Sequence, residues 1–166
     1  MATYKLPHFG QLDPVNLDEY YDVGIDFNGK EIQIDLNFEN KTIGIKRLDM
    51  VGRFLEKLNE FDEKNKKYME QDYKDEEGDT VRTYIEHHLQ EIDKDELNEL
   101  VDFDNKLIEP ATQLMEKLQL VRVGLYPDAE DQFATFDYSI GEEFTNYLVV
   151  INIDAKGKLD YMTMES

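Results

Sequence analysis

Four carboxylates on one face of a predicted β-hairpin are the side chains whose spacing points most clearly to chemistry. Asn28-Gly29 stands between two segments, 21–27 and 32–38, in which apolar residues alternate, and this setting is typical of a two-residue turn. The resulting register pairs apolar residues on one face and sets acids opposite each other on the other, namely Asp26 opposite Glu31 and Asp22 opposite Asp35. Facing like charges destabilise a strand pair by up to about 1 kcal/mol. Either water and salt screen them, or the face receives a cation from a basic protein or, less readily, a metal.

A second candidate is Asp137, which stands alone between Phe136 and Tyr138 in a predicted strand. A carboxyl enclosed by apolar neighbours can have the shifted pKa that acid–base catalysis requires. Arg122 holds a similar place in another predicted strand, and the two form an ion pair if their strands are neighbours. We interpret them as an ordinary cross-strand pair, with a catalytic carboxyl as the alternative.

The three histidines do not form a metal-ligand pattern. His87 and His88 are adjacent, and consecutive residues of a helix point about 100° apart, so the pair is poorly placed to hold one ion. His88 falls on the apolar side of its predicted helix and is expected at the edge of the core, with His87 exposed. His8 follows Leu6-Pro7 in a predicted N-terminal loop, from which it could approach the sheet. The sequence predicts neither a metal nor a cofactor.

The charge balance defines which partners the chain can accept. Its 166 residues include 18 basic and 38 acidic side chains, a net charge of −20. Such a field repels phosphate backbones, and the short basic clusters at 46–47 and 64–67 have acids beside them, so we exclude direct nucleic-acid binding. Residues 70–104 hold fourteen acids and three basic residues. This is typical of a solvated helical face or, alternatively, of a docking surface for a cationic protein.

Composition points to one cytoplasmic domain. The sequence has no cysteine, which excludes disulfides, thiol catalysis and cysteine-ligated zinc. The first residues lack the apolar run of a signal peptide, and no segment approaches the roughly 20 apolar residues of a membrane span. The length suits a single domain over residues 1–166. We therefore expect a cytoplasmic protein that does not enter membranes.

The elements that would position these side chains follow an α+β order. After the hairpin, apolar residues recur with helical spacing from about 45 to 118, with a loop at 75–79. Short apolar runs bounded by turns then predict four strands, at 120–126, 133–140, 147–153 and 159–164. The run 147–151 is apolar on both faces and is expected to be interior. We predict an antiparallel sheet of about six strands, the hairpin plus these four, with the helical block packed on one face.

Several motifs resemble a family of small bacterial proteins. They are Leu6-Pro7-His8-Phe9-Gly10, Tyr20-Tyr21-Asp22, Phe27-Asn28-Gly29, Ile34-Asp35-Leu36-Asn37, Val121-Arg122-Val123-Gly124-Leu125-Tyr126-Pro127 and Phe136-Asp137-Tyr138-Ser139. Nearly from end to end, the chain resembles the family catalogued as domain of unknown function number two thousand and four. The resemblance implies a bacterial cytosolic α+β protein and brings no established activity or catalytic residues. In character the chain also resembles antitoxin and immunity proteins, which neutralise basic toxins by charge-complementary docking.

These observations lead to one expectation and two alternatives. The leading hypothesis is a non-enzymatic acidic binding protein that engages a cationic protein, as an immunity protein engages a toxin. The first alternative is a small hydrolase or metal-dependent enzyme that uses Asp137, His8 or the hairpin acids. The second is a module that binds a divalent cation.

Overall fold

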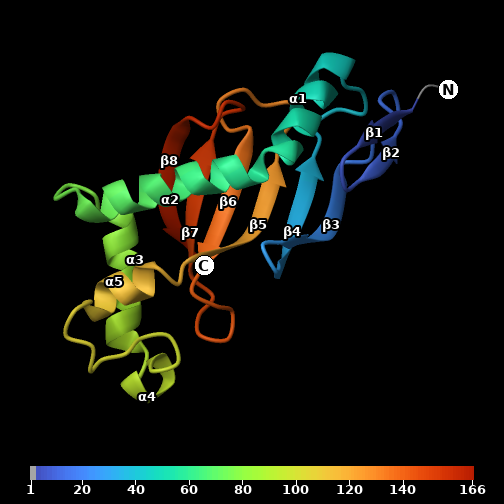
Figure 1. Cartoon of the computed structure of the whole chain (residues 1–166). Helices are drawn as coiled ribbons and strands as arrows, with labels where there is room; N and C mark the ends of the chain where they lie inside the picture. The colour runs from blue at the N-terminus through green and yellow to red at the C-terminus, as the bar shows by residue number, and fades with distance from the viewer. Residues whose placement is uncertain (1–2) are drawn as a thin grey trace.

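The computed structural model describes residues 3–166, and its largest element is a six-stranded sheet of order β3-β4-β5-β6-β7-β8 (Figure 1). Its strands are β3 (Tyr20–Phe27), β4 (Lys30–Asn37), β5 (Gln119–Leu125), β6 (Ala134–Ser139), β7 (Leu148–Ile153) and β8 (Leu159–Glu165). The α+β class is as predicted and β7 is interior, but the strands differ in detail from the prediction, because residues 4–12 form a second, two-stranded sheet. All neighbours are antiparallel except β4 and β5, which run parallel. A fully antiparallel sheet was therefore wrong at one pair, because the helices return the chain to the end of the sheet where β4 begins.

The β3–β4 hairpin has the predicted register. Asn28 and Gly29 adopt positive φ angles of 53° and 86°, the conformation that a tight hairpin turn requires. The facing pairs include Ile25 with Ile32, Val23 with Ile34, Asp26 with Glu31 and Asp22 with Asp35. The side-chain alternation and the turn thus act together to place all four acids on one face.

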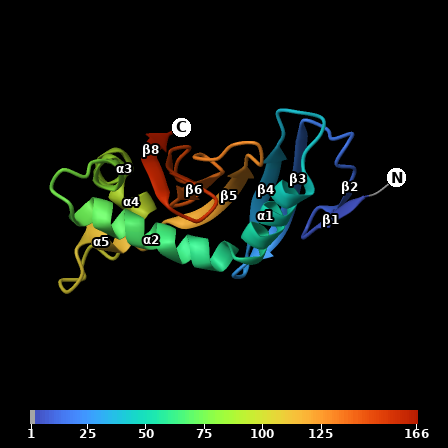
Figure 2. The ribbon, with the colours of Figure 1, turned by 90° about the horizontal axis from the view of Figure 1, so that it is seen from above.

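Helices α1 (Ile45–Glu56) and α2 (Leu58–Lys74) lie across the other face of the sheet, as both views show (Figures 1 and 2). Phe54 of α1 is at the centre of this contact. Its ring stacks on Phe61 of α2 with centroids 4.1 Å apart, and it meets Phe133 and Phe136 at 5.3 and 6.0 Å. Because these rings join both helices to β6 and the residue before it, they fix which face of the sheet is covered.

The remaining helices form a lobe beside β7 and β8, at the end of the sheet away from β3 (Figure 1). They are α3 (Thr80–Glu91), α4 (Lys94–Leu97) and α5 (Pro110–Met115). α3 packs against α2, α5, β7 and β8, and Asp72 of α2 accepts a hydrogen bond from the Val81 N–H at 2.8 Å. The prediction of one helical block on one face therefore holds for α1 and α2 but not for this lobe.

A separate two-stranded sheet, β1 (Tyr4–Leu6) with β2 (Gly10–Leu12), stands beside β3 and α1 (Figure 1). The hydroxyl of Tyr4 donates to the carboxylate of Asp49 in α1, which ties this sheet to the body. The predicted loop around His8 is thus a hairpin turn, in which His8 has a φ of 68°. In residues 3–166, no helix has both the length and the apolar character needed to span a membrane.

Candidate functional site

At the centre of the open face of the sheet, Arg122 of β5 lies between two carboxylates. Its Nε and Nη2 donate to Oδ2 and Oδ1 of Asp35 at 2.7 and 3.0 Å, and its Nη1 donates to Oδ2 of Asp137 at 3.2 Å. Asn37 also donates to Oδ1 of Asp35 at 2.7 Å. The side chain of Asp35 is 0% exposed, that of Asp137 9% and that of Arg122 32%. A two-point contact with a buried carboxylate fixes the guanidinium in place.

The strand register explains how Arg122 reaches both acids. Arg122 and Asp137 face each other in the antiparallel β5–β6 pair, as predicted from sequence, whereas Asp35 faces Gly124 in the parallel β4–β5 pair. A Cβ atom on Gly124 would lie 2.8 Å from Nη2 of Arg122 and 3.2 Å from Oδ1 of Asp35. The lack of a side chain at Gly124 therefore leaves the space through which the guanidinium reaches Asp35.

Arg122 and Asp137 both have raised pKa values, and the physical causes differ. Burial alone would lower the pKa of Arg122, but the hydrogen bonds and charge of Asp35, and then the charge of Asp137, raise it above its usual range. Burial raises the pKa of Asp137, although the charge and hydrogen bond of Arg122 oppose this shift. Arg122 is thus permanently charged, and Asp137 is the carboxyl in the site that is easier to protonate than an exposed one.

Asp35 differs from the other three hairpin acids, because its side chain is not exposed to solvent. Asp22, Asp26 and Glu31 are exposed, so solvent can screen them as expected. Asp35 is fully buried, because β4 is an interior strand with β5 on its other side. Its charge is compensated by Arg122 rather than by water.

Two adjoining hollows flank Arg122 on the open face. The Tyr161 hollow has a volume of about 610 Å³ and extends over β6, β7 and β8; its lining includes Tyr126, Asp137, Leu148, Val150, Tyr161 and Glu165. The hairpin hollow has a volume of about 680 Å³ and extends toward β3; its lining includes Asp22, Glu31, Asp137, Glu142 and Leu148. Because Arg122, Asp137 and Leu148 line both, we call the two together the acidic groove.

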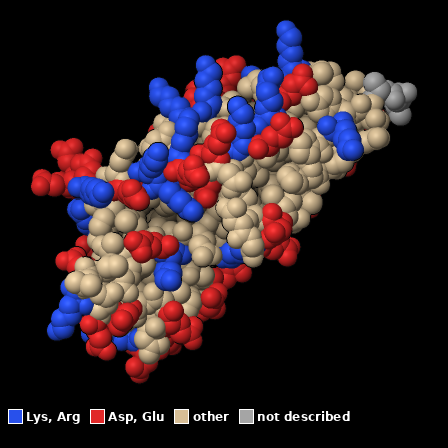
Figure 3. Space-filling model, viewed as in Figure 1, with Lys and Arg blue, Asp and Glu red and all other residues tan. Residues whose placement is uncertain are grey.

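The acidic groove carries most of its charge in one sign. Its lining holds seven acids, Asp22, Glu31, Glu39, Asp128, Asp137, Glu142 and Glu165, and one basic residue, Arg122. On the opposite side, residues 45–74 of α1 and α2 hold eight basic and seven acidic residues, and Figure 3 shows the Lys and Arg side chains gathered along these helices. The two faces of the sheet therefore present different potentials to a partner.

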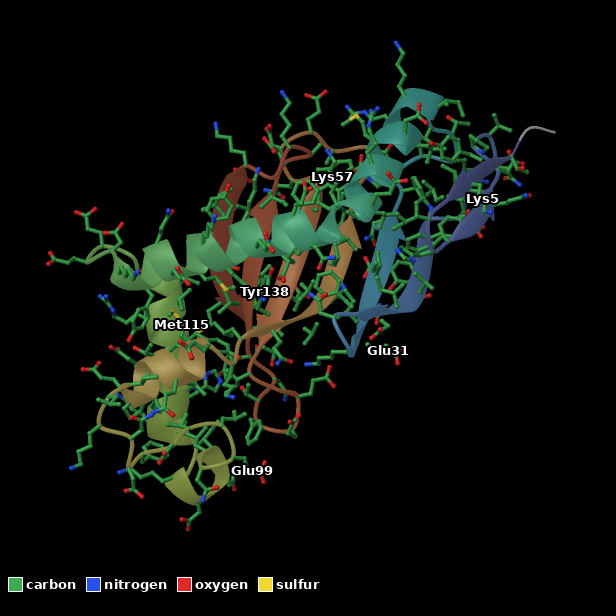
Figure 4. All side chains as sticks on the ribbon, viewed as in Figure 1. Lys5, Glu31, Lys57, Glu99, Met115 and Tyr138 are labelled. Atoms are coloured by element: carbon green, nitrogen blue, oxygen red, sulfur yellow. The ribbon has the colours of Figure 1, made fainter. Side chains whose placement is uncertain are left out.

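A second buried polar group lies under α2. The Tyr138 hydroxyl donates to Oδ1 of Asp62 at 2.7 Å and accepts from Nδ2 of Asn65 at 3.3 Å, and Lys66 pairs with Oδ2 of Asp62 at 3.3 Å. Figure 4 shows Tyr138 between the sheet and this helix. Burial, followed by the charge of Asp62, raises the pKa of Tyr138 well above its ordinary value. Tyr138 therefore joins α2 to β6 as a neutral hydroxyl, whereas Oδ1 of Asn65 has no hydrogen-bond partner among residues 3–166.

His88 is buried, as the periodicity predicted, and bridges two segments. Its Nδ1 lies 2.6 Å from the carbonyl oxygen of Tyr84, and its Nε2 lies 2.7 Å from Oγ1 of Thr145. With Nδ1 protonated, the Thr145 hydroxyl donates to Nε2. A hydroxyl that donates to a histidine held by a second hydrogen bond is also the arrangement by which a histidine activates a hydroxyl nucleophile. Thr145 also accepts the N–H of Tyr147 at 3.0 Å, and neither side chain lines the acidic groove. The contact therefore fixes residues 141–147 against α3. His87, expected to be exposed, is half-buried with its ring 5.0 Å from that of Tyr147.

The buried histidine predicts an acid-sensitive fold. Burial lowers the pKa of His88 below its usual 6.5, so below that pH the unfolded chain takes up a proton that the folded chain does not. Stability should therefore fall as the pH drops through 6.5 toward the folded pKa. Melting temperatures between pH 7.5 and 5.5 should drop less for His88→Gln than for the native protein. His8→Gln, which changes an exposed histidine, is the control. Equal slopes for the native protein and His88→Gln would contradict the assignment.

The other predicted candidates do not assemble into one site. His8 lies in the β1–β2 turn and is not among the residues that line the acidic groove. Asp26 is near the tip of the hairpin and outside both hollows. Within residues 3–166, no group of three or more histidine, aspartate or glutamate side chains has an arrangement that could hold a metal ion.

Comparison of the chain with family models, with curated proteins and with solved structures finds no match in any of the three.

Proposed function

We propose that this protein is a non-enzymatic binding protein whose acidic groove receives a basic segment of a partner protein. The observation that carries the proposal is the concave open face, where seven acids surround a single arginine. That arginine is already paired with Asp35 and Asp137, so it offers little attraction to an anion. Uncompensated acids on a concave surface favour a cationic occupant and speed its approach.

An immunity role, in which the protein neutralises a basic toxin inside the cell, is the form of this proposal that the chain's size and acidity suggest. The acidic lobe around α3 and α4 contributes in a different way. Its charges are spread over exposed helical surface, so they act at long range on the rate of encounter, whereas the groove determines where the partner stays.

Matched charge variants test whether the groove is the docking surface. The groove variant combines the changes Asp22→Asn, Glu31→Gln, Glu142→Gln and Glu165→Gln. The lobe variant combines Glu86→Gln, Glu91→Gln, Glu96→Gln and Glu99→Gln. All eight positions are exposed, and each variant removes four negative charges.

Immobilised native protein is expected to retain a basic partner from host extract at low salt and to release it at high salt. The groove variant should weaken retention of that same partner by about tenfold or more, whereas the lobe variant should change mainly the association rate. Binding of the partner identified in this way is then measured with purified components. Equal losses in both variants would contradict the groove, and no retained partner at low salt would contradict the proposal as a whole.

An enzymatic role remains the second candidate because of one observation. Asp137 is a buried carboxyl with a raised pKa in the lining of a hollow, a setting in which general acids occur. A hydrolase of this kind requires turnover of ester, glycoside or phosphoester substrates that disappears in Asp137→Asn. Binding of a basic partner without such turnover favours the first proposal.

A further inference from the structure

Asp137 lines the Tyr161 hollow, and one of its two carboxylate oxygens has no hydrogen-bond donor among residues 3–166. Its side chain is more than nine-tenths buried, with 9% of its surface exposed. Oδ2 accepts from Arg122, whereas Oδ1 accepts no hydrogen bond from any residue between 3 and 166. Oδ1 is not among the buried side-chain atoms that lack a partner, so it is open to solvent. Because Asp137 lines the hollow, a donor that enters the hollow can reach this oxygen.

The charge around Oδ1 calls for a cation rather than a neutral donor. Arg122, Asp35 and Asp137 together carry one net negative charge, and the Nε and Nη2 donors of Arg122 are directed to Asp35. Glu165 lines the same hollow, and its charge adds to the cost of ionising Asp137. A positive group placed at Oδ1 relieves this unfavourable interaction.

The walls of the Tyr161 hollow suit a long side chain that ends in a flat cation. Leu148 and Val150 provide apolar surface, and Tyr126 and Tyr161 provide aromatic rings. The methylene groups of an arginine can lie along the apolar wall, while its planar guanidinium stacks on a tyrosine and donates to a carboxylate. A lysine ammonium gains less, because it is a strongly hydrated point charge.

We propose that an arginine side chain of the partner occupies the Tyr161 hollow and donates to Oδ1 of Asp137. This inference rests on the proposed function and identifies the partner side chain that makes the central contact with the acidic groove. The arginine is then a central, desolvated contact of the kind that dominates binding energy, and the rim acids are contacts that orient it.

The test uses the whole protein and small probes. Acetyl-arginine amide is titrated while backbone amide shifts are followed by NMR, with acetyl-citrulline amide as the neutral analogue of the same shape and acetyl-lysine amide as the second cation. We expect the arginine probe to shift amides of β6, β7 and β8 around Asp137. The citrulline probe should bind at least about tenfold more weakly than the arginine probe, because it lacks the positive charge. The lysine probe should fall between them.

Three variants decide whether Asp137 is the anchor. Asp137→Asn should weaken the arginine probe about tenfold, as expected for loss of a charge-assisted hydrogen bond. Val150→Phe fills the hollow without changing Arg122, Asp35 or Asp137, and it should abolish binding of the arginine probe. It provides the test if Asp137→Asn folds poorly. Glu63→Gln, on the exposed side of α2, makes the same charge change on the opposite face and should have no effect.

The outcomes separate this inference from the proposed function. Shifts spread over the lobe of α3 and α4, equal binding of arginine and citrulline probes, or no shifts would overturn the arginine anchor. Retention of a basic partner that depends on the groove acids but not on Asp137 or Val150 would overturn the anchor and leave the proposed function standing. Arginine binding at Asp137 by a protein that retains no partner would support the hollow and count against the proposed function.

Discussion

Replacing Arg122 with methionine is expected to lower the free energy of unfolding by about 3–5 kcal/mol, because one base compensates two buried carboxylates and its removal leaves them unpaired. Asp35 has no exposed surface, and Asp137 has little, so water cannot replace the guanidinium. Methionine is of similar length and preserves the packing of the arginine stem. Urea unfolding at pH 7.5 measures the loss.

The pH dependence of this variant distinguishes unpaired charge from lost packing. Burial raises the pKa of Asp137, and without Arg122 the charge and hydrogen bond that oppose this shift are lost. The deficit relative to the native protein is then complete above the raised pKa of Asp137 and shrinks as the pH falls through it. A loss of packing would give a deficit that does not change with pH.

Two further variants complete the test. Arg47→Met removes the exposed pair with Glu130, whose side chains are 31% and 83% exposed, and should cost under about 1 kcal/mol. Adding Asp35→Leu to Arg122→Met removes the more buried carboxylate and should recover part of the loss. An Arg122→Met protein as stable as the native one would show that the carboxylates are satisfied without the guanidinium.

Local rules predicted those parts of the fold that neighbouring residues determine. The hairpin register follows from Asn28-Gly29 and the alternation on either side, and the pairing of Arg122 with Asp137 follows from two isolated charges in consecutive strands. The place of β5 beside β4 depends on how the helices return the chain, which no local pattern encodes. The burial of Asp35 follows from that contact and was therefore missed.

The signal that could have revealed the centre was present in the sequence. Gly124 interrupts the apolar strand 120–126 two residues after Arg122, and an isolated glycine in a strand often marks a close approach of another group. Here that group is the guanidinium of Arg122. The acidic groove as a whole depends on which face α1 and α2 cover, and this is decided by side chains far from the groove.

Those side chains are the aromatic rings around Phe54, and they give the last prediction. Phe54→Ala is expected to lower the free energy of unfolding by about 3–5 kcal/mol, because Phe54 is 2% exposed and its removal leaves a cavity among Phe61, Phe133 and Phe136. Urea unfolding with an unchanged m-value measures the loss. Phe103→Ala, at a half-buried position in the lobe, should cost less.

The same variant separates stability from binding. Phe54 lies on the side of the sheet that α1 and α2 cover, whereas the acidic groove is formed by side chains of the opposite face. Folded Phe54→Ala protein, held well below its melting temperature, should therefore bind the arginine probe as tightly as the native protein. A loss of stability under about 1 kcal/mol would show that other contacts hold α1 on the sheet. Weakened probe binding by the folded variant would show that the covered face helps to shape the open one.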